Sequence, residues 1–573
     1  MCLACSGCSS GLRSLPLPCR CGARRQRKNA PVNRPVTAPL LSASAIWRIA
    51  GQLRRVLQPV EYGPAILAFT VLRRLEQARP STGRGLAAIA CADDPLRALS
   101  GLIARLPAAL RDIMAQLEVD RLARRLAAVD TLGLLAAHFA ALDLSPTLYG
   151  SEAMAQLFEE LVSHFTTTQG TGTHYTPPEV ADLMVDLVCA ADTPGTRLAL
   201  YDPAAGTGAL LGRAADRLHA RVVTADLYGQ ELNAQSCALA RADLLLRGLK
   251  PRQMVQGDTL LADGHARQRF GRMLANPPFG LDWRAISASI QAEHALGAQG
   301  RFGPGLPRVS DGSMLFMLHL LAKMRAPRHG GSRIGVVTHA AALNGGGVES
   351  GESAIRRYLV EHDLIDTVIA LPQDMFINTG IGTYVWVLDN SKPAARRGLV
   401  SLVNAAALWR RCSRSHGEKR REMTQAHVAA VVQAALDGAE LDLDVQDGPD
   451  GAPASWRLVP PAVAVPQGRR TGFARQVPAR AFLYRSLSVT CADHAGAPTR
   501  TVFTTSMETD PQEWFDRLIA PHDPTARLDR ARAGIGCAIS FARYFDTSAP
   551  CRPLPEIEAD LRQSMARLAA LMP

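Results

Sequence analysis

The sequence predicts an α/β protein with a doubly wound, mostly parallel sheet, preceded by an all-helical domain and followed by a partly helical region. Residues 44–79 place apolar side chains three and four positions apart, which is the period of an α-helix. From about residue 170, short apolar runs alternate with helical stretches, as in parallel sheets with crossover helices. A chain of 573 residues is too long for one core and allows about three or four domains.

We expect four segments along the chain. Residues 1–43 form a basic, cysteine-rich leader that we expect to be disordered, and residues 44–165 form the helical domain. Residues 166–400 contain the alternating strands and helices, and residues 401–573 form the C-terminal region.

The leader holds a large share of the charge and of the cysteines. The formal net charge is +12, and residues 1–40 hold seven basic residues and no acid, so the global charge is weak evidence for a nucleic-acid partner. Five of the twelve cysteines lie there, and their C-x2-C-x2-C spacing is compatible with a metal or iron–sulfur site. We favour a flexible leader or an over-long translation start, because Pro, Ser, Arg and Gly dominate and no His completes a ligand set.

The cysteine pattern in the rest of the chain is typical of a protein from a reducing compartment. Its seven cysteines are scattered singly, so we expect a cytoplasmic location. No apolar run approaches the roughly 20 residues of a membrane span, and no secretory signal is present, so we expect no membrane partner.

The sheet domain contains seven candidate strands. They lie at 196–202, 227–232, 254–258, 272–276, 333–339, 365–372 and 383–390. Helical stretches between them lie at 208–219, 233–248, 311–325 and 353–363. Ahead of the first strand, Thr176 is a good N-cap, Pro177 fits the first helical position, and Glu179 completes a T-x-x-E capping box. Beyond residue 400 we expect helices over 420–436 and 555–572, whereas 440–512 has no clear pattern.

Glycines follow the first candidate strand, in the segment LALYDPAAGTGAL. The strand ends at Asp202, and a loop with Gly206 and Gly208 leads into a helix. In open α/β sheets ligands bind beyond the carboxyl ends of the strands, and glycines allow a ligand close to the backbone. No G-K-[ST] follows, and the third glycine of the dinucleotide fingerprint is missing. A tight turn without a ligand is the alternative interpretation.

Two acids follow the next two strands. Glu231 can accept hydrogen bonds from both hydroxyls of a ribose, although a helix N-terminal acid is the alternative. Asp258 can accept from an adenine amino group, although an ordinary turn aspartate is the alternative. Together with Asp202 they indicate an adenosine-bearing cofactor without a pyrophosphate, and S-adenosylmethionine fits.

The fourth candidate strand ends in ANPPFG, residues 275–280. Asn276 supplies a side-chain carbonyl oxygen and Pro277 a backbone carbonyl, and two such acceptors favour charge developing on an exocyclic amine during methyl transfer. The prolines offer no competing N–H, and Pro278 holds the turn. Phe279 offers a flat face on which a base can stack. A rigid loop is the alternative for this motif alone.

These motifs in this order resemble those of the modification subunit of type I restriction–modification systems, a family of N6-adenine DNA methyltransferases. Further resemblance lies in the segments IWRIAGQLRRVLQPVEYGPAILAFTVLRRLE, FEELVSHF, GTHYTPPEV, GESAIRRYLVEHDLIDTVIALPQDMFINTGIGTYVWVLDNSKP, GLVSLVNAAALWRRCSRSHGEKRREMT and GIGCAISFARYFDTSAPCRPLPEIEADL. It spans about residues 44 to 569 and is weakest at 440–500. The Asp that usually precedes the NPPF strand is missing, because Phe270-Gly271-Arg272 stands there.

The resemblance implies a set of site residues. Asn276 to Phe279 would hold a flipped adenine, and Glu231 would hold the ribose of S-adenosylmethionine. The expected catalytic residues are Asn276, Pro277, Pro278 and Phe279, and the expected cofactor-binding residues are Thr173, His174, Tyr175, Thr176, Pro177, Pro178, Asp202, Ala205, Gly206, Thr207, Gly208, Glu231 and Asp258.

The resemblance also implies partners. These are DNA, a specificity subunit flanked by two copies of this chain, and a restriction subunit. Adenine N6 lies inside the duplex, so the base must be flipped out, and the transfer needs no metal. We expect the helical N-terminal and C-terminal regions to dock the specificity subunit and to clamp DNA. A methyltransferase acting on RNA or protein, or an inactive remnant that still binds its partner, are the alternatives.

Overall fold

The computed structural model describes residues 43–53, 56–78, 85–150, 153–154, 156–158, 160–162, 176–377, 379–416, 418–448, 452–461, 469–492, 498–545 and 554–571. The expected leader, with its C-x2-C-x2-C motif, lies outside these residues. Within them, no group of three His, Cys, Asp or Glu side chains is placed to hold a metal ion. No helix in the same ranges combines the length and apolar character needed to cross a membrane.

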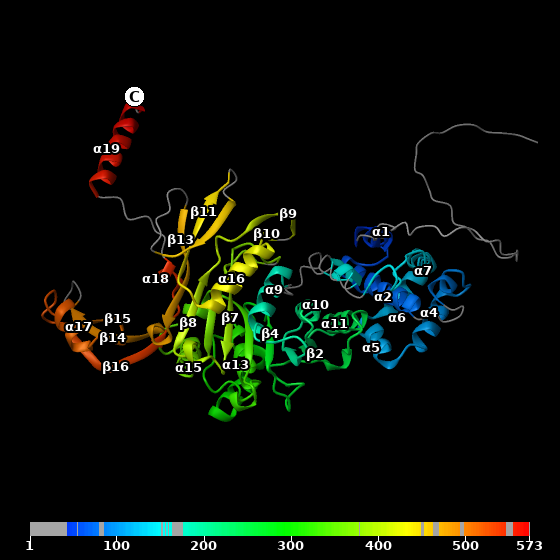
Figure 1. Ribbon diagram of the computed structural model, residues 1–573, viewed down its shortest axis with the longest axis horizontal. Coiled ribbons are helices and arrows are strands. Elements are labelled where there is room, and N and C mark those ends of the chain that lie inside the picture. Colours follow the sequence, from blue (N-terminus) through cyan, green and yellow to red (C-terminus); the bar gives the residue numbers. More distant parts are fainter. Residues whose placement is uncertain are drawn as a thin grey trace, which may run out of the picture. The chain divides into compact units, whose positions relative to one another are not determined.

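Helices make up the described chain from residue 43 to residue 140, as the sequence predicts (Figure 1). They are α1 (Ala43–Leu53), α2 (Pro59–Ala78), α3 (Leu86–Ala90), α4 (Pro95–Ala104), α5 (Ala108–Gln116), α6 (Val119–Ala127) and α7 (Leu132–Ala140). In α6, Leu122 and Leu126 are buried four positions apart while Arg124 is exposed, which is the amphipathic pattern of a surface helix. The core of these helices also takes in Leu239 and Leu246 of α11 (Ala234–Leu246), so the helical region packs on the sheet domain.

All seven predicted strands are confirmed, and they lie in one eleven-stranded sheet. They are β1 (Arg197–Asp202), β2 (Thr224–Glu231), β3 (Met254–Gln256), β4 (Arg272–Ala275), β5 (Arg333–His339), β6 (Ile365–Ala370) and β7 (Thr383–Asp389). The four predicted helices between them are confirmed as α10 (Ala209–Ala220), α11, α13 (Ser313–Ala322) and α15 (Gly351–Glu361). Strands β1 to β5 run parallel, and β7 runs antiparallel to β5 and β6.

The order of the strands reverses beside β1. The first five strands lie in the order β3-β2-β1-β4-β5, so the chain moves away from β1 and then returns to its other side with β4. Such a reversal opens a crevice outside the carboxyl ends of the two central strands, where ligands bind in open α/β sheets. Asp202 is the last residue of β1, and Asn276 directly follows β4. The topology therefore brings both predicted groups to one edge.

The strands contribute side chains to two cores, one on each face of the sheet. Along β4, Met273 and Ala275 are buried in one core and Leu274 in the other. Helices α9 (Pro178–Val188), α10 and α16 (Gln425–Asp437) cover the Leu274 side, whereas α13 and α15 cover the opposite side. Because both faces are covered, the strands read as continuous apolar runs in the sequence.

Four further strands extend the sheet past β6. β8 (Leu399–Asn404) pairs parallel with β6, and β13 (Arg469–Pro478) pairs antiparallel with β8. β11 (Leu441–Asp447) and β12 (Pro453–Val459) complete that side. Part of 440–512, for which no element could be predicted, is therefore strand. The predicted boundary at residue 400 falls within β8, and the domain limits stay predictions.

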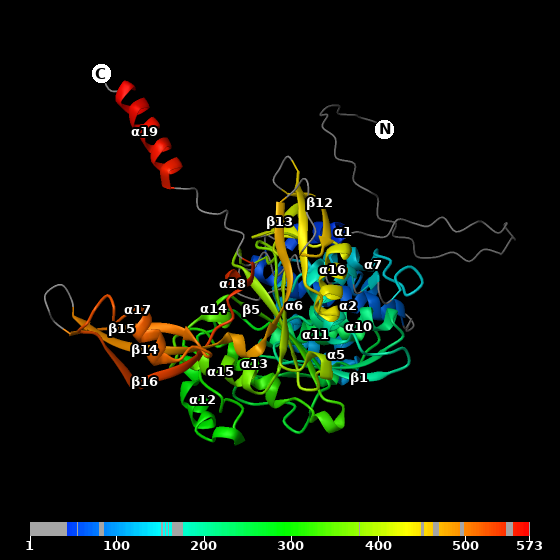
Figure 2. The ribbon, with the colours of Figure 1, turned by 60° about the vertical axis from the view of Figure 1, so that its left-hand side comes forward.

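The described C-terminal chain also forms two smaller sheets. One is the hairpin of β9 (Arg410–His416) and β10 (Lys419–Glu422). The other contains β14 (Leu483–Ala492), β15 (Pro498–Ser506) and β16 (Arg527–Cys537), with α17 (Pro511–Leu518) beside it (Figure 2). The remaining α-helices are α12 (Ser287–His294), α14 (Ala341–Asn344), α18 (Phe541–Phe545) and α19 (Leu554–Leu571), the last of which confirms the helix predicted at the C-terminus.

The helix predicted over 420–436 is wrong at its start. Helix α16 begins only at Gln425, because Thr424 forms its N-cap and accepts a hydrogen bond from the backbone N–H of His427. The preceding residues pair in β10 instead. Helical periodicity does not reveal this break, since a basic strand can precede a cap without changing the apolar spacing.

A substitution at Gly208 tests the packing of the loop after β1. Gly208 has a φ of +85°, and a methyl group there would lie 2.9 Å from Cβ of Ala240 in α11. Gly208→Ala should therefore cost about 1–3 kcal/mol through backbone strain and overpacking, measured as a fall in the thermal unfolding midpoint. Gly195→Ala is the matched control, because its φ is +84° and a methyl group would meet no atom within 4 Å. Equal falls for both variants would contradict the contact between α10 and α11.

Candidate functional site

Asp202 lies buried at the carboxyl end of β1. Its side chain is 1% exposed, and its Oδ1 accepts a hydrogen bond from the N–H of Ala204 at 2.9 Å. Burial, opposed by the N–H of Ala204 and helped by the nearby charge of Glu231, raises the pKa of this carboxyl to about 7. A cationic ligand beside Asp202 would favour the charged carboxylate and so lower its pKa again.

Glu231 joins the loops that follow β1 and β2. Its Oε2 accepts from the N–H of Gly206 at 2.8 Å, and its Oε1 accepts from the N–H of Asn233 at 2.8 Å. Helix α11 is capped by Asn233, whose side chain accepts from the N–H of Ser236 at 2.9 Å. Because Glu231 accepts from the N–H of this N-cap residue, its alternative role as a helix N-terminal acid stays open. Burial raises the pKa of Glu231, although its backbone hydrogen bonds oppose that.

Asp258 directs the turn after β3. Its Oδ1 accepts from the N–H of Leu260 at 2.8 Å, which is the hydrogen bond of an ordinary aspartate turn. The next residue, Thr259, donates its hydroxyl to the carbonyl of Pro203 at 2.6 Å. The turn after β3 is thus tied directly to the loop after β1, and Asp258 stands at the same edge as Asp202.

Asn276 is buried and held by the segment before α9. Its side chain is 6% exposed, and its Nδ2 donates to the hydroxyl of Thr176 at 3.0 Å. This hydrogen bond spans 100 residues of sequence, and it ties the loop after β4 to the segment before α9. Pro277 is buried beside it, and Pro278 is half-buried.

The predicted capping box at Thr176 is wrong. Helix α9 begins at Pro178, and its N-cap is Pro177, with φ −57° and ψ 141°. A residue before a proline is disfavoured in the helical region, so the second proline moves the helix start by one position. Glu179 pairs instead with the Nζ of Lys419 at 2.5 Å.

Phe279 stands between two other rings. Its ring centroid lies 5.8 Å from that of His339 and 6.2 Å from that of Phe376, both edge-on. His339 Nδ1 accepts from the N–H of Ala341, so Nε2 carries the hydrogen and donates to Asp311 at 2.7 Å. Burial alone would raise the pKa of Asp311, but the hydrogen bonds from His339 and Ser313 lower it to about 2.

His339 and Asp311 were not predicted as site residues. A usable signal is present for His339, because it is the last residue of β5, next to β4 in the sheet. Strand ends of neighbouring parallel strands meet at one edge, so the polar residue ending RIGVVTH belongs to the same set as Asp202 and Asn276. Asp311 has no local signal, since its contact with His339 comes from a distant loop.

A buried polar cluster lies beneath the site. Tyr201 bonds through its hydroxyl to Nε2 of His319 at 3.0 Å, and Nδ1 of the same ring lies 3.1 Å from Nη1 of Arg301. Arg301 also donates to the carbonyls of Thr259 and Leu260, both at 2.7 Å. Burial lowers the pKa of His319 to about 3, so the ring is neutral. The cluster holds the turn after β3 against β1.

The remaining predicted residues divide into three groups. Ala205 is buried and donates its N–H to the carbonyl of Gln230, and Thr207 is half-buried in the same loop. Gly208 packs against α11 and so serves the fold of that loop. Thr173, His174 and Tyr175 lie outside the described residues, and their role stays a prediction.

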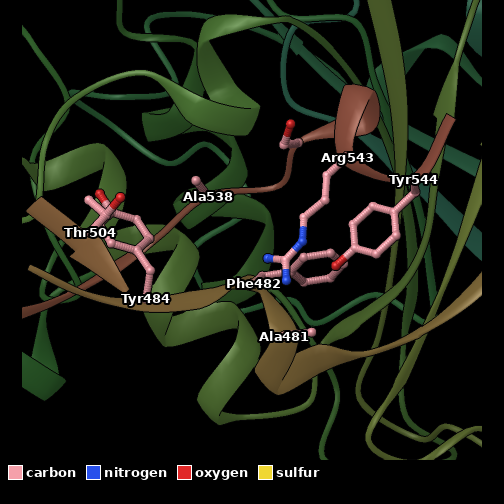
Figure 3. A pocket seen from close by; sticks show the side chains of 8 residues that line it. Ala481, Phe482, Tyr484, Thr504, Ala538, Arg543 and Tyr544 are labelled. Atoms are coloured by element: carbon pink, nitrogen blue, oxygen red, sulfur yellow. The ribbon is translucent and has the colours of Figure 1, made fainter. Parts of the chain in front are cut away.

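A cavity elsewhere contains none of the predicted residues. It measures about 290 Å³ and is lined by Ala481, Phe482, Tyr484, Thr504, Ala538, Ser540, Arg543 and Tyr544 (Figure 3). Phe482 and Tyr544 meet edge-on there at 6.2 Å between ring centroids, and Figure 3 shows the Arg543 side chain reaching toward Phe482. This cavity lies between the sheet of β14–β16 and α18, away from the carboxyl ends of β1 and β4.

Comparison with known proteins gives a consistent result. The family model of the N-6 DNA methylases matches residues 150–443, which include every predicted site residue. The methylase subunit of the type I restriction enzyme MjaIX from Methanocaldococcus jannaschii is 26% identical over 292 residues, 49% of this chain and 48% of that protein. The HindI methylase subunit from Haemophilus influenzae is 23% identical over 265 residues, 45% of this chain and 55% of that protein. The chain thus matches about half the length of these relatives.

One solved structure supports the fold. It is the type I restriction–modification system methyltransferase subunit from Streptococcus thermophilus, with a TM-score of 0.53 and 22% identity. The match covers 69% of this chain and 92% of that one.

The raised pKa of Asp202 predicts a pH-dependent stability. Because its pKa moves from the ordinary 3.8 to about 7, the native state binds more protons than the unfolded state between these values, and stability falls as pH rises through this window. Asp202→Asn removes this effect. The thermal midpoint of the variant minus that of the native protein, both without ligand, should therefore rise between about pH 5 and about pH 8. A difference that stays constant with pH would contradict the shifted pKa.

Proposed function

Because this chain belongs to the family of N-6 DNA methylases, we propose that it transfers a methyl group from S-adenosylmethionine to adenine N6 in duplex DNA, as the modification subunit of a type I restriction–modification system. The observation that carries this proposal is the hydrogen bond between Asn276 and Thr176, which holds the side chain of Asn276 at the strand-order reversal. The similarity to type I methylase subunits supports the system type.

The acids at the ends of β1 and β2 suit S-adenosylmethionine. Asp202 is buried and Glu231 is half-buried, and both have raised pKa values, so a cation and ligand hydroxyls would favour their charged forms. Glu231 would hold the ribose, and Asp258 would meet the adenine end at the turn after β3. The loop from Ala205 to Gly208 would contact the ligand through its backbone atoms. When bound, S-adenosylmethionine supplies the methyl group.

The NPPF loop would hold the target base. The lone pair of adenine N6 is delocalised into the ring, so the amine is a poor nucleophile. Acceptors at Asn276 and the Pro277 carbonyl would draw the amine hydrogens and favour positive charge on nitrogen as the methyl group arrives. Phe279 would stack on the base, and the edge-on contacts from His339 and Phe376 hold its ring in place.

The pocket that would hold the flipped base contributes little net free energy toward selecting a DNA sequence. Flipping the base costs a few kcal/mol, and stacking on one aromatic ring returns about 1–3 kcal/mol. Sequence choice would therefore come from a specificity subunit carrying two copies of this chain, with a restriction subunit added for cleavage. The helical region of α1–α7 and the C-terminal region would dock that partner, in the cytoplasm.

A methylation assay tests the proposal. The full chain is co-purified with its specificity subunit and incubated with S-adenosylmethionine labelled in the methyl group. Duplex DNA should acquire label as N6-methyladenine, and ribosomal RNA should not. Label on RNA or protein alone would favour another methyltransferase, and no label on any of the three would favour an inactive, partner-binding chain.

Asn276→Ala should abolish most of the methyl transfer. Loss of one acceptor that acts on the developing charge reduces turnover by about 100-fold or more. The dissociation constant for S-adenosylmethionine, measured by calorimetry, should stay within about threefold, a change of well under 1.4 kcal/mol. Near-normal turnover in this variant would sink the proposed role of the loop.

Glu231→Gln should show the opposite pattern. A hydrogen bond to a charged acceptor is worth about 1.5–3 kcal/mol, so its loss should weaken S-adenosylmethionine binding by about tenfold or more. Turnover at saturating cofactor should change less than it does in Asn276→Ala. If affinity is unchanged, Glu231 does not hold the ribose.

A further inference from the structure

The hairpin of β9 and β10 is rich in basic residues and lies beside the site. Residues 409–422 contain six Arg or Lys and two Glu. Neither strand belongs to the main sheet, so the hairpin adds nothing to its strand order. We call it the basic hairpin.

Two anchors fix the basic hairpin to the protein. Lys419 pairs with Glu179 in the first turn of α9 at 2.5 Å. On the other side, the backbone N–H groups of Arg420 and Arg421 donate to the carbonyl of Asp374, at 2.9 and 3.1 Å. The carboxylate of Asp374 also lies 3.8 Å from Nε of Arg421. The hairpin therefore bridges α9 and the segment after β6.

Both anchors are next to the proposed adenine pocket. Glu179 lies three positions after Thr176, which accepts the hydrogen bond that fixes the proposed amide acceptor. On the other side, a backbone N–H of the hairpin donates to the carbonyl of Ile377 at 2.7 Å. The neighbouring Phe376 contacts Phe279 through its ring. Ile377 and Phe376 thus connect the hairpin to the loop that would hold the base.

Like charges face each other on one side of the hairpin. Arg411 and Arg421 are directly opposite in the antiparallel register, a pairing that repels. The guanidinium of Arg421 lies 4.0 Å above the ring of Trp409, and Arg411 is exposed. The opposite face is different, because Arg410 pairs there with Glu422 at 2.7 Å. The carboxylate of Asp374 near Arg421 offsets part of this repulsion, and a phosphate anion between the two arginines would offset more of it.

We propose that the basic hairpin binds the phosphate backbone of duplex DNA beside the flipped nucleotide, through Arg411 and Arg421 with Arg420 next to them. This inference rests on the proposed function. A base held by Asn276 and Phe279 remains joined to its two phosphates, which must pass the rim of the pocket. The hairpin forms part of that rim, and closely spaced phosphates match closely spaced arginines.

DNA binding by the full chain tests the hairpin. Binding to a fluorescent duplex of mixed sequence, with S-adenosylmethionine present, is followed by anisotropy at several salt concentrations. The slope of log affinity against log salt should become shallower by about 0.9 for each phosphate that the variant no longer neutralises. Arg411→Gln should show one such step, and the double variant R411Q/R420Q should show about two.

The controls separate charge from structure. Arg411→Lys keeps the charge and should restore most of the slope. Arg328→Gln removes an exposed arginine just before β5, at the opposite edge of the parallel strands, and should bind DNA as the native chain does. Unchanged affinity for S-adenosylmethionine in every variant shows that the pocket is folded.

The outcomes separate the hairpin proposal from the proposed methyltransferase function. An unaltered slope in R411Q/R420Q overturns the hairpin proposal even if DNA is methylated, and so does a native chain that fails to bind duplex at low salt. A loss confined to binding of the specificity subunit overturns it in favour of a protein contact. Shallower slopes in a chain that methylates nothing support the hairpin and count against the proposed function alone.

Discussion

The reversal of strand order between β1 and β4 is the constraint on which the site depends. Because β1 has β2 on one side and β4 on the other, the loops after all three strands converge. The hydrogen bond from Gly206 to Glu231 joins the loops on one side. On the other side, the hydrogen bond from Asn276 to Thr176 holds the loop after β4. Because β4 lies beside β1, the second hydrogen bond holds its loop at the same edge of the sheet as the first.

At two acids of the candidate site the charged form is disfavoured, and a cationic ligand would reduce that electrostatic cost. Asp202 and Glu231 are both withdrawn from water, and the charge of Glu231 disfavours that of Asp202. By contrast, Asp311 is charged, since its hydrogen bonds from His339 and Ser313 outweigh its burial. The first pair belongs to the part of the crevice that suits a cation, and Asp311 supports the ring that would stack on a base. The same edge of the sheet thus contains two electrostatic environments. At Asp202 and Glu231 carboxylate charge is disfavoured, and at Asp311 it is stabilised.

Most local features could be predicted from the sequence, because they depend on short-range rules. The strands from β1 to β7 carry apolar runs, and the polar residues expected after them lie at one edge of the sheet, while their roles stay predictions. The cap at Thr176 failed because a second proline displaced the helix start. The strands β11 to β13 could not be predicted, since antiparallel addition to a sheet depends on partners far away in sequence. The contact of Asp311 with His339 was missed for the same reason.

The position of β8 has a consequence for folding during synthesis of the chain. Its inner edge pairs with β6, but its outer edge is covered only by β13, which begins 65 residues after β8 ends. Until that segment leaves the ribosome, β8 presents a row of unsatisfied N–H and C=O groups flanked by apolar side chains such as Leu402. A nascent or prematurely ended chain is therefore exposed to edge-to-edge aggregation, and chaperones would be needed most during that interval.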